Sequence, residues 1–382
     1  MLIPNNKQKT KLFQYSGASR FAYNWTLARQ KENYANGGKF ISDNDLRKEF
    51  TQLKKTNEYN WLNDISNNVT KQAIKDACDS YRRFFKGYSK FPKFKSKKKS
   101  KPSFYQDNVK IKFTNTHVKL EGFATNKKKN KQKLNWIRLA EKDRVPFGEG
   151  VKYANPRITF DGLNWFVSVS IEYSDSINLP INDGIGIDLG VKDLAICSDG
   201  IVYKNINKSK EVKKLEKKKR RLQRKVSKKY LLNKKGGSYR KTCNIIKSEK
   251  QLLKVSRRLT NIRQNYLHQV TTEIIKRNPS FISVENLNVG GMMKNRCLSK
   301  AVQQQSFYEF KRKIQYKSEW NNIKFIEIDR WYPSSKTCSE CGCVKSDLKL
   351  SDREFVCPSC GIVLDRDYNA SVNIKNYGQS MI

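Results

Sequence analysis

The sequence is poor in histidine and has no long apolar segment. Only two histidines, His117 and His268, occur in 382 residues, which argues against a reaction built on imidazole. No apolar run approaches the roughly 18–20 residues that a membrane-spanning helix needs. No signal peptide opens the chain, so these features together predict a cytoplasmic protein.

Acidic residues are also scarce, because 35 Asp and Glu stand against 78 Lys and Arg, giving a net charge of +43. Such an excess repels itself unless an anion neutralises it. Nucleic acid is the expected partner, since neutralised phosphates release counterions and reward many basic side chains. That partner would place the protein at the nucleoid. An anionic membrane is the weaker alternative, because the basic residues are spread over several segments.

Cysteine is unevenly distributed, which indicates a metal site. Four of the nine cysteines are scattered singly, and five lie between residues 338 and 360. Two Cys-x2-Cys pairs separated by 15 residues have the spacing of a zinc ribbon: Cys338, Cys341, Cys357 and Cys360. Four thiolates close a tetrahedral structural zinc site and leave no open position for catalysis. A disulfide pair and a ligand exchange with Cys343 are the alternatives.

Helical periodicity dominates the start of the chain, in segments 9–34, 43–53 and 68–85. Helices joined by short links predict a small bundle over residues 9–90. Tyr, Trp and Arg side chains occur throughout these helices. They form either an ordinary core with a solvated face or a surface that contacts nucleic acid.

The pattern becomes strand-like after Phe91-Pro92-Lys93-Phe94-Lys95, where Pro92 cannot continue a helix. A dense basic run at 97–101 follows. Alternation of period two then recurs in five short segments: 109–113, 117–120, 136–139, 157–160 and 165–171. Asp161-Gly162 is a strong hairpin signal, and a Lys-rich turn is expected at 126–133. These strands predict a small barrel or curled sheet, followed by a polar linker at 174–183.

The most basic stretch is 204–263, in which apolar residues keep helical spacing on both sides of Gly236-Gly237. This pattern predicts two helices joined by a Gly-rich loop. A charge run is usually a solvated face or a disordered arm. Because helical periodicity persists within the run, the favoured interpretation is a helix pair that lies on nucleic acid.

Strands and helices alternate in the rest of the chain, which indicates an α/β sheet. The expected strands are 185–187 paired with 194–196, then 281–285 and 323–328. A loop is expected at 288–300 and a helix at 301–320.

Three acids occupy notable positions in this α/β part. Asp188 interrupts the apolar run Gly184–Gly190, Glu285 ends Phe281–Glu285, and Asp367 opens the last helix. A carboxylate in a buried strand is costly unless it holds a metal. Alone, Asp188 could simply start a turn, and Asp365 or Asp367 could cap the helix. Together, the three acids could hold two divalent ions for phosphodiester hydrolysis, and Mg²⁺ prefers such oxygen ligands.

These motifs resemble those of the TnpB family, insertion-sequence-encoded RNA-guided endonucleases similar to type V CRISPR effectors. The specific matches are Gly-Ile-Asp188-Leu-Gly190, Val284-Glu285-Asn286-Leu287, the four-cysteine ribbon and Asp365-Arg366-Asp367-x-Asn369-Ala370. Tyr23-Asn24-Trp25 and Phe91-Pro92-Lys93-Phe94-Lys95 match more weakly. Family members usually begin with a strand before the Ile-Pro turn, and here only Leu2–Ile3 stands for it.

The resemblance implies a multidomain α/β, β-barrel and helical-bundle protein. A β-barrel wedge domain is expected at 1–8 and 91–175, with a helical recognition bundle inserted at 9–90. A RuvC-like, RNase H-type nuclease domain is expected at 183–330 and 362–382, with the basic hairpin at 204–263 and an inserted zinc ribbon at 331–361. The family's catalytic acids correspond to Asp188, Glu285 and Asp367, with Asp365 as the reserve for the third.

The resulting hypothesis is a transposon-encoded, Mg²⁺-dependent RNA-guided DNA endonuclease with a structural zinc, a guide RNA and a double-stranded DNA target. Base pairing would read the target, and the protein would read a short flanking motif. A monomer is favoured. The alternatives are a guide-RNA-dependent repressor that does not cut, and an unguided nuclease of the resolvase or transposase type.

Overall fold

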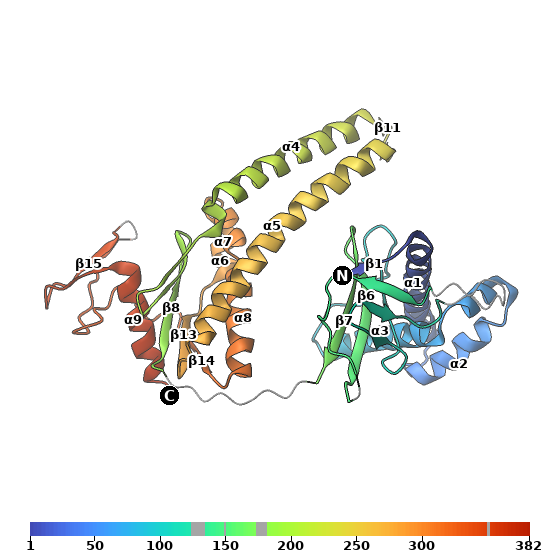
Figure 1. The fold of residues 1–382 in the computed structure, drawn as a ribbon, viewed down its shortest axis with the longest axis horizontal. Helices are drawn as coiled ribbons and strands as arrows, with labels where there is room; N and C mark the ends of the chain where they lie inside the picture. Colours follow the sequence, from blue (N-terminus) through green and yellow to red (C-terminus); the bar gives the residue numbers. More distant parts are fainter. Residues whose placement is uncertain (124–133, 149, 173–181, 350–351) are drawn as a thin grey trace. The chain divides into compact units, whose positions relative to one another are not determined.

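The computed structural model describes residues 1–123, 134–148, 150–172, 182–349 and 352–382. The chain divides into two compact units, Met1–Ser174 and Asp175–Ile382 (Figure 1). The Lys-rich turn expected at 126–133 lies outside the described residues, and so does the expected linker at 174–183 except for its last two residues.

The first unit contains a seven-stranded antiparallel sheet in the order β2-β6-β7-β1-β5-β4-β3. Its strands are β1 (Leu2–Ile3), β2 (Ser103–Tyr105), β3 (Lys112–Phe113), β4 (His117–Lys119), β5 (Trp136–Leu139), β6 (Tyr153–Phe160) and β7 (Trp165–Ile171). Leu2 pairs with both Leu139 and Trp165, so the two residues of β1 join the two halves of the sheet. The expected hairpin at Asp161-Gly162 is present between β6 and β7.

Helices α1 (Asn6–Ala35) and α3 (Asn67–Phe85) pack beside this sheet, α2 (Asp43–Leu53) packs on α3, and a short 3₁₀ helix covers Asn57–Asp64. They confirm the three expected helical segments. Asn5 and Gln8 form a reciprocal capping box at the start of α1. The Gln8 side chain also donates to the carbonyls of Leu134 and Trp136, at 3.0 and 2.8 Å. The start of α1 is therefore fixed to the sheet next to β5.

The two weaker sequence motifs of this unit contact each other. The Asn24 side chain donates to the Lys95 carbonyl and accepts from the Lys95 N–H, both at 2.8 Å. The Lys95 ammonium lies 3.6 Å from the centroid of the Tyr23 ring. Tyr23-Asn24-Trp25 therefore anchors the extended segment that leads from α3 towards β2.

The second unit contains a five-stranded mixed sheet in the order β10-β9-β8-β13-β14. The strands are β8 (Ile185–Leu189), β9 (Asp193–Cys197), β10 (Val202–Lys204), β13 (Phe281–Glu285) and β14 (Lys324–Ile328). β8, β9 and β10 form an antiparallel meander, and β13 runs parallel to both β8 and β14. The predicted hairpin between 185–187 and 194–196 and the two later strands are confirmed.

Helices cover both faces of this sheet, with α9 (Arg366–Gln379) on one face and α5 (Cys243–Lys276) and α8 (Phe307–Trp320) on the other (Figure 1). A buried cluster joins the strands to α5 and α8, and includes Ile187, Ile282, Ile274 and Phe310. α4 (Lys210–Leu232) packs along α5, and the two helices are joined by the small hairpin of β11 (Lys234–Lys235) and β12 (Ser238–Tyr239). The predicted basic helix pair is thus present.

Two expectations for this unit were wrong in detail. The loop expected at 288–300 contains a short helix, α6 (Val289–Lys294), which Asn288 caps. The single helix expected at 301–320 is divided into α7 (Ser299–Gln305) and α8, because Ser306 adopts a left-handed conformation with φ 57°. In the first unit, the strand expected at 109–113 is shortened to β3, since Asp107 accepts hydrogen bonds from the N–H groups of Val109 and Lys110.

No helix among the described residues is both long and apolar enough to span a membrane.

Candidate functional site

Two of the three predicted acids lie on neighbouring parallel strands. Val284 of β13 pairs with Ile187 of β8. If this register is continued by one residue, Glu285 stands opposite Asp188. Paired residues on adjacent strands point to the same face, and the strands are about 4.8 Å apart. The sheet therefore brings these two carboxylates together.

The third acid, Asp367, lies in the first turn of α9. Asp365 is the cap of this helix, because its carboxylate accepts from the N–H groups of Asp367 and Tyr368, both at 3.0 Å. α9 is held against the sheet at a close approach, since a Cβ on Gly186 of β8 would collide with the backbone of Ser371 and Lys375. This close packing of α9 against β8 directs the start of the helix towards Asp188.

Glu285 and Asp367 both act electrostatically on Asp188. Burial raises the pKa of Asp188 well above its usual range, and the charges of Glu285 and Asp367 raise it further, while Arg366 opposes them. Burial also raises the pKa of Glu285, against a hydrogen bond from the Ser334 hydroxyl at 2.5 Å. Clustered like charges of this kind are typical of functional sites.

The three carboxylates nevertheless do not converge on a point. Among the described residues, they are not a group whose ligand atoms all lie within 4.8 Å of one another. The Asp367 carboxylate accepts from the Arg366 guanidinium at 2.8 Å, and the Arg353 guanidinium lies 3.8 Å away. A cation is therefore already present beside the acids in the form of Arg366. The donor set of carboxylate oxygens fits a hard divalent ion such as Mg²⁺.

The four predicted zinc ligands do converge. Sγ atoms of Cys338, Cys341, Cys357 and Cys360 all lie within 4.8 Å of one another. Cys343 is not part of this group, and instead its carbonyl accepts from the Cys338 N–H at 2.9 Å. Gly342 and Gly361, with φ of 75° and 72°, follow the second cysteine of each pair and make the turns that aim the thiols inward. Backbone N–H groups of Cys360 and Ser359 lower the pKa of the Cys357 thiol to about 6, which favours the thiolate that a metal binds.

A hydrogen-bonded network connects the cysteine cluster to the acids. Asn369 of α9 donates to the Thr337 carbonyl at 2.7 Å and accepts from the Ser339 N–H at 3.0 Å. Asn373 donates to the carbonyls of Ser334 and Thr337, at 2.8 and 2.6 Å. Both amides are buried. Ser334, held in this way, is the residue that donates to Glu285.

Arg366, Ser334 and Asn373 had no predicted role. Arg366 could have been found, because it lies between two acids of a quoted motif. Asn369 and Asn373 place two amides on the apolar side of a helix, which is a detectable signal. Ser334 has no local signal, since its role depends on a partner 49 residues away.

The cationic surface of this unit is concentrated on α4. Val212 is the buried residue of the helix, and its long basic side chains are exposed: Lys213, Lys214, Lys217, Lys218, Arg220, Arg221, Arg224, Lys225 and Lys228. Glu216 and Glu211 pair with Arg263 and Arg258 of α5, at 2.8 and 2.7 Å, so the acids of α4 face its partner helix. The outer face is left to the cations.

Comparison with known proteins gives matches along most of the chain. Three family models match, described as a helix-turn-helix domain over residues 1–39, a probable transposase over 168–296 and a Cas12f1-like TNB domain over 307–374. The first of these covers β1 and a single long helix, α1, in this structure.

Two relatives align over almost the whole chain. "Putative RNA-guided DNA endonuclease InsQ" of Escherichia coli K12 is 28% identical over 100% of this chain and 92% of its own length. "Putative RNA-guided DNA endonuclease" of Streptomyces pristinaespiralis is 29% identical over 98% of this chain and 87% of its own length. A solved structure titled "Cryo-EM structure of the Cas12f1-sgRNA-target DNA complex" shares the fold, with a TM-score of 0.59 and 15% identity over 97% of this chain and 81% of that chain.

The protein therefore has the fold of that solved structure, with mixed α/β content, and carries a four-cysteine cluster. The chain resembles the TnpB family, as its motifs indicated, because it matches these transposase and Cas12f1-like family models and aligns along its length with proteins named RNA-guided DNA endonucleases.

Proposed function

We propose that the protein is an RNA-guided DNA endonuclease encoded by a transposable element. The observation that carries the proposal is the placement of Asp188 and Glu285 on neighbouring parallel strands and of Asp367 in the first turn of α9, with the charges of Glu285 and Asp367 acting on Asp188. The names of the full-length relatives agree with it. The 204–263 hairpin and the first unit would neutralise the phosphates of a guide RNA and of the target DNA.

In this proposal the domains follow the boundaries given by the resemblance. Residues 183–330 and 362–382 form a RuvC-like nuclease domain, 331–361 a zinc ribbon, 9–90 a recognition bundle, and 1–8 with 91–175 a wedge domain. The protein acts as a monomer. Figure 1 supports the separation of the ribbon, because β15 (Glu354–Val356) and β16 (Val363–Asp365) extend away from the five-stranded sheet.

Asp188, Glu285 and Asp367 would hold Mg²⁺. Divalent ions at such a site activate a water and stabilise the leaving oxygen of a phosphodiester. Ser334 orients the Glu285 carboxylate, and Arg366 neutralises Asp367 until it is needed as a ligand. Cys338, Cys341, Cys357 and Cys360 would hold a structural zinc, so metal analysis should find one zinc per chain in the Cys343→Ser variant and none in Cys338→Ser.

The test is cleavage by the full-length protein purified with its bound RNA, using a matched DNA target and Mg²⁺. Glu285→Ala should keep the RNA and lower the cleavage rate by at least about 100-fold. Glu319→Ala, an exposed glutamate of α8, is the matched control and should cut normally.

Each other outcome identifies a rival. Persistent cutting by Glu285→Ala would refute the acid assignment. RNA-dependent target binding without cutting by the unmodified protein would favour a repressor, and cutting by RNA-free protein would favour an unguided nuclease.

A further inference from the structure

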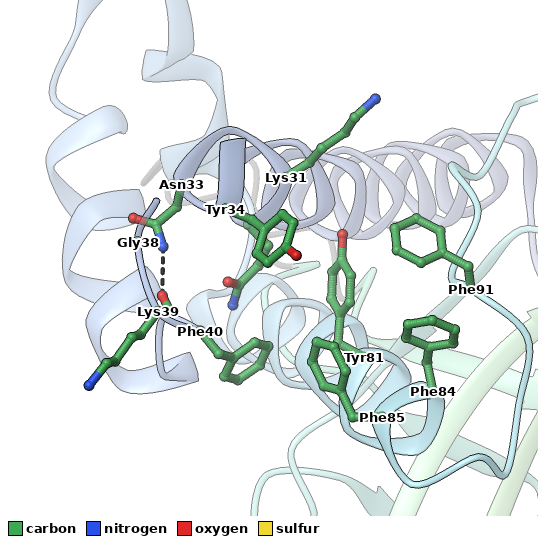
Figure 2. Close-up of a pocket in the computed structure, with 11 residues that line it drawn as sticks. Lys31, Asn33, Tyr34, Gly38, Lys39, Phe40, Tyr81, Phe84, Phe85 and Phe91 are labelled. Carbon is green, nitrogen blue, oxygen red and sulfur yellow. Dashed lines mark hydrogen bonds between the residues drawn. The ribbon is translucent and has the colours of Figure 1, made fainter. Parts of the chain in front are cut away.

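The first unit contains a pocket that the proposed chemistry does not use. The cavity has a volume of about 550 Å³ and lies where the end of α1, the 36–41 loop and the end of α3 meet. Figure 2 shows the aromatic rings gathered around it. Six aromatic side chains line the pocket: Tyr34, Phe40, Tyr81, Phe84, Phe85 and Phe91.

The pocket is shaped by specific contacts within the chain. The buried Gln30 side chain accepts from the Ile41 N–H at 3.1 Å and donates to the Ile41 carbonyl at 2.6 Å. Asn33 donates to the Lys39 carbonyl at 2.6 Å, the contact drawn in Figure 2. Together they tie the 36–41 loop to α1. Tyr81 and Phe85 are stacked with an interplanar angle of 22°.

Its rings are unusually exposed for aromatic side chains. Tyr34 is 83% exposed, Phe85 66% and Phe91 52%, although Tyr81 at the base is only 6% exposed. Aromatic surface gathered in this way is costly in water and typically marks a binding site. The exposed rings therefore need a ligand that offers a flat apolar face.

The charge around the pocket selects the kind of ligand. Lys31 and Lys39 belong to its lining, and none of the lining residues is acidic. The Arg82 guanidinium lies 5.8 Å from the Phe40 ring and is held by Asp43, at 3.1 Å. Rings on which a base can stack, flanked by ammonium groups that can reach phosphates, are the features of single-strand nucleic-acid sites.

We propose that this pocket binds an unpaired nucleobase of the guide RNA, stacked on Tyr34 and Phe85, with Lys31 and Lys39 on the adjoining phosphates. The identity of the strand rests on the proposed function, in which the guide is the nucleic acid held before DNA arrives. The stacking itself depends only on the pocket.

Ultraviolet cross-linking of the purified RNA–protein complex, followed by mass spectrometry of the peptides, tests the assignment. We expect ribonucleotide adducts on the peptides that carry Tyr34 and Phe85. Adducts elsewhere on the chain without any at these two positions would overturn the proposal. Deoxyribonucleotide adducts at the pocket would overturn the assignment to RNA, and a peptide–peptide cross-link there would show a protein partner instead.

Affinity for an oligouridylate RNA gives the second measurement. The RNA-free full-length protein with both Tyr34→Ala and Phe85→Ala should bind this RNA about tenfold or more weakly than the unmodified protein. Replacing Phe85 with Tyr instead of Ala should recover most of the lost affinity. Phe147→Ala, which removes a half-exposed ring outside the pocket, should bind as the unmodified protein does. Equal affinity of the double variant and the control would contradict stacking, whereas guided cleavage with no pocket adducts would leave the nuclease proposal intact.

Discussion

Asp365 and Asp367 are two residues apart, yet their carboxylates make different interactions. Asp365 caps α9 with two backbone hydrogen bonds, and Asp367 faces Arg366 and the other acids. Asp365→Ala should therefore lower the free energy of unfolding by about 1 kcal/mol and leave cleavage active. Asp367→Asn should abolish cleavage with little loss of stability. Chemical denaturation and a cleavage assay on both variants measure this, and the reverse result would make Asp365 the third catalytic acid.

The raised pKa of Asp188 predicts that the stability of the metal-free protein depends on pH. Burial and the neighbouring carboxylates raise its pKa in the folded state. The native protein thus keeps a proton that the unfolded chain loses near about pH 3.9. The stability contributed by this proton is present below that pH and is lost as the pH rises through the raised pKa.

In the Asp188→Asn variant this loss cannot occur. Its melting temperature should therefore exceed that of the unmodified protein by at least about 2 °C at pH 8, with a smaller difference at about pH 5. Mg²⁺ should raise the melting temperature of the unmodified protein only. The exposed Asp347→Asn change is the control, and a difference that does not vary with pH would argue against the linkage of the three acids.

At the scale of elements, the packing of α9 on β8 is the contact that assembles the site. Gly186→Ala would place a methyl group against the backbone of Ser371 and Lys375, which cannot move away as a flexible side chain could. We expect a loss of about 1–3 kcal/mol in unfolding free energy and a strong loss of cleavage.

Gly17→Ala is the matched control for that change. It lies inside α1 with nothing within 4 Å of the added Cβ, so alanine should stabilise the helix by about 0.5–1 kcal/mol. Thermal melting and cleavage of both variants make the comparison. An active, fully stable Gly186→Ala protein would show that the approach of α9 is not required.

The elements were largely predictable because their signals are local. Helical spacing gave α1, α2 and α3, and Asp161-Gly162 gave the β6–β7 hairpin. The break at Ser306 was missed because neither proline nor glycine marks it. The contact of Ser334 with Glu285 was missed for a different reason, since it arises only when distant segments pack together.

At the scale of the whole molecule, the net charge of +43 predicts steep salt dependence of RNA binding. Replacing Lys217, Lys218 and Arg221 on the outer face of α4 with Gln should reduce the slope of log K against log salt by up to about 0.7–0.9 per lost phosphate contact. Exchanging Lys and Arg at the same positions preserves charge and should leave the slope unchanged. Equal slopes for all three proteins would show that α4 does not contact the RNA.

The network of Asn369, Asn373 and Ser334 also limits how this protein can be recombined with its relatives. A ribbon exchanged at residues 331–361 would bring a foreign loop against the amides of α9 and would replace Ser334, the hydroxyl donor of Glu285. The segment that must be exchanged as one piece is therefore larger than the ribbon. It begins before Ser334 and ends after Asn373.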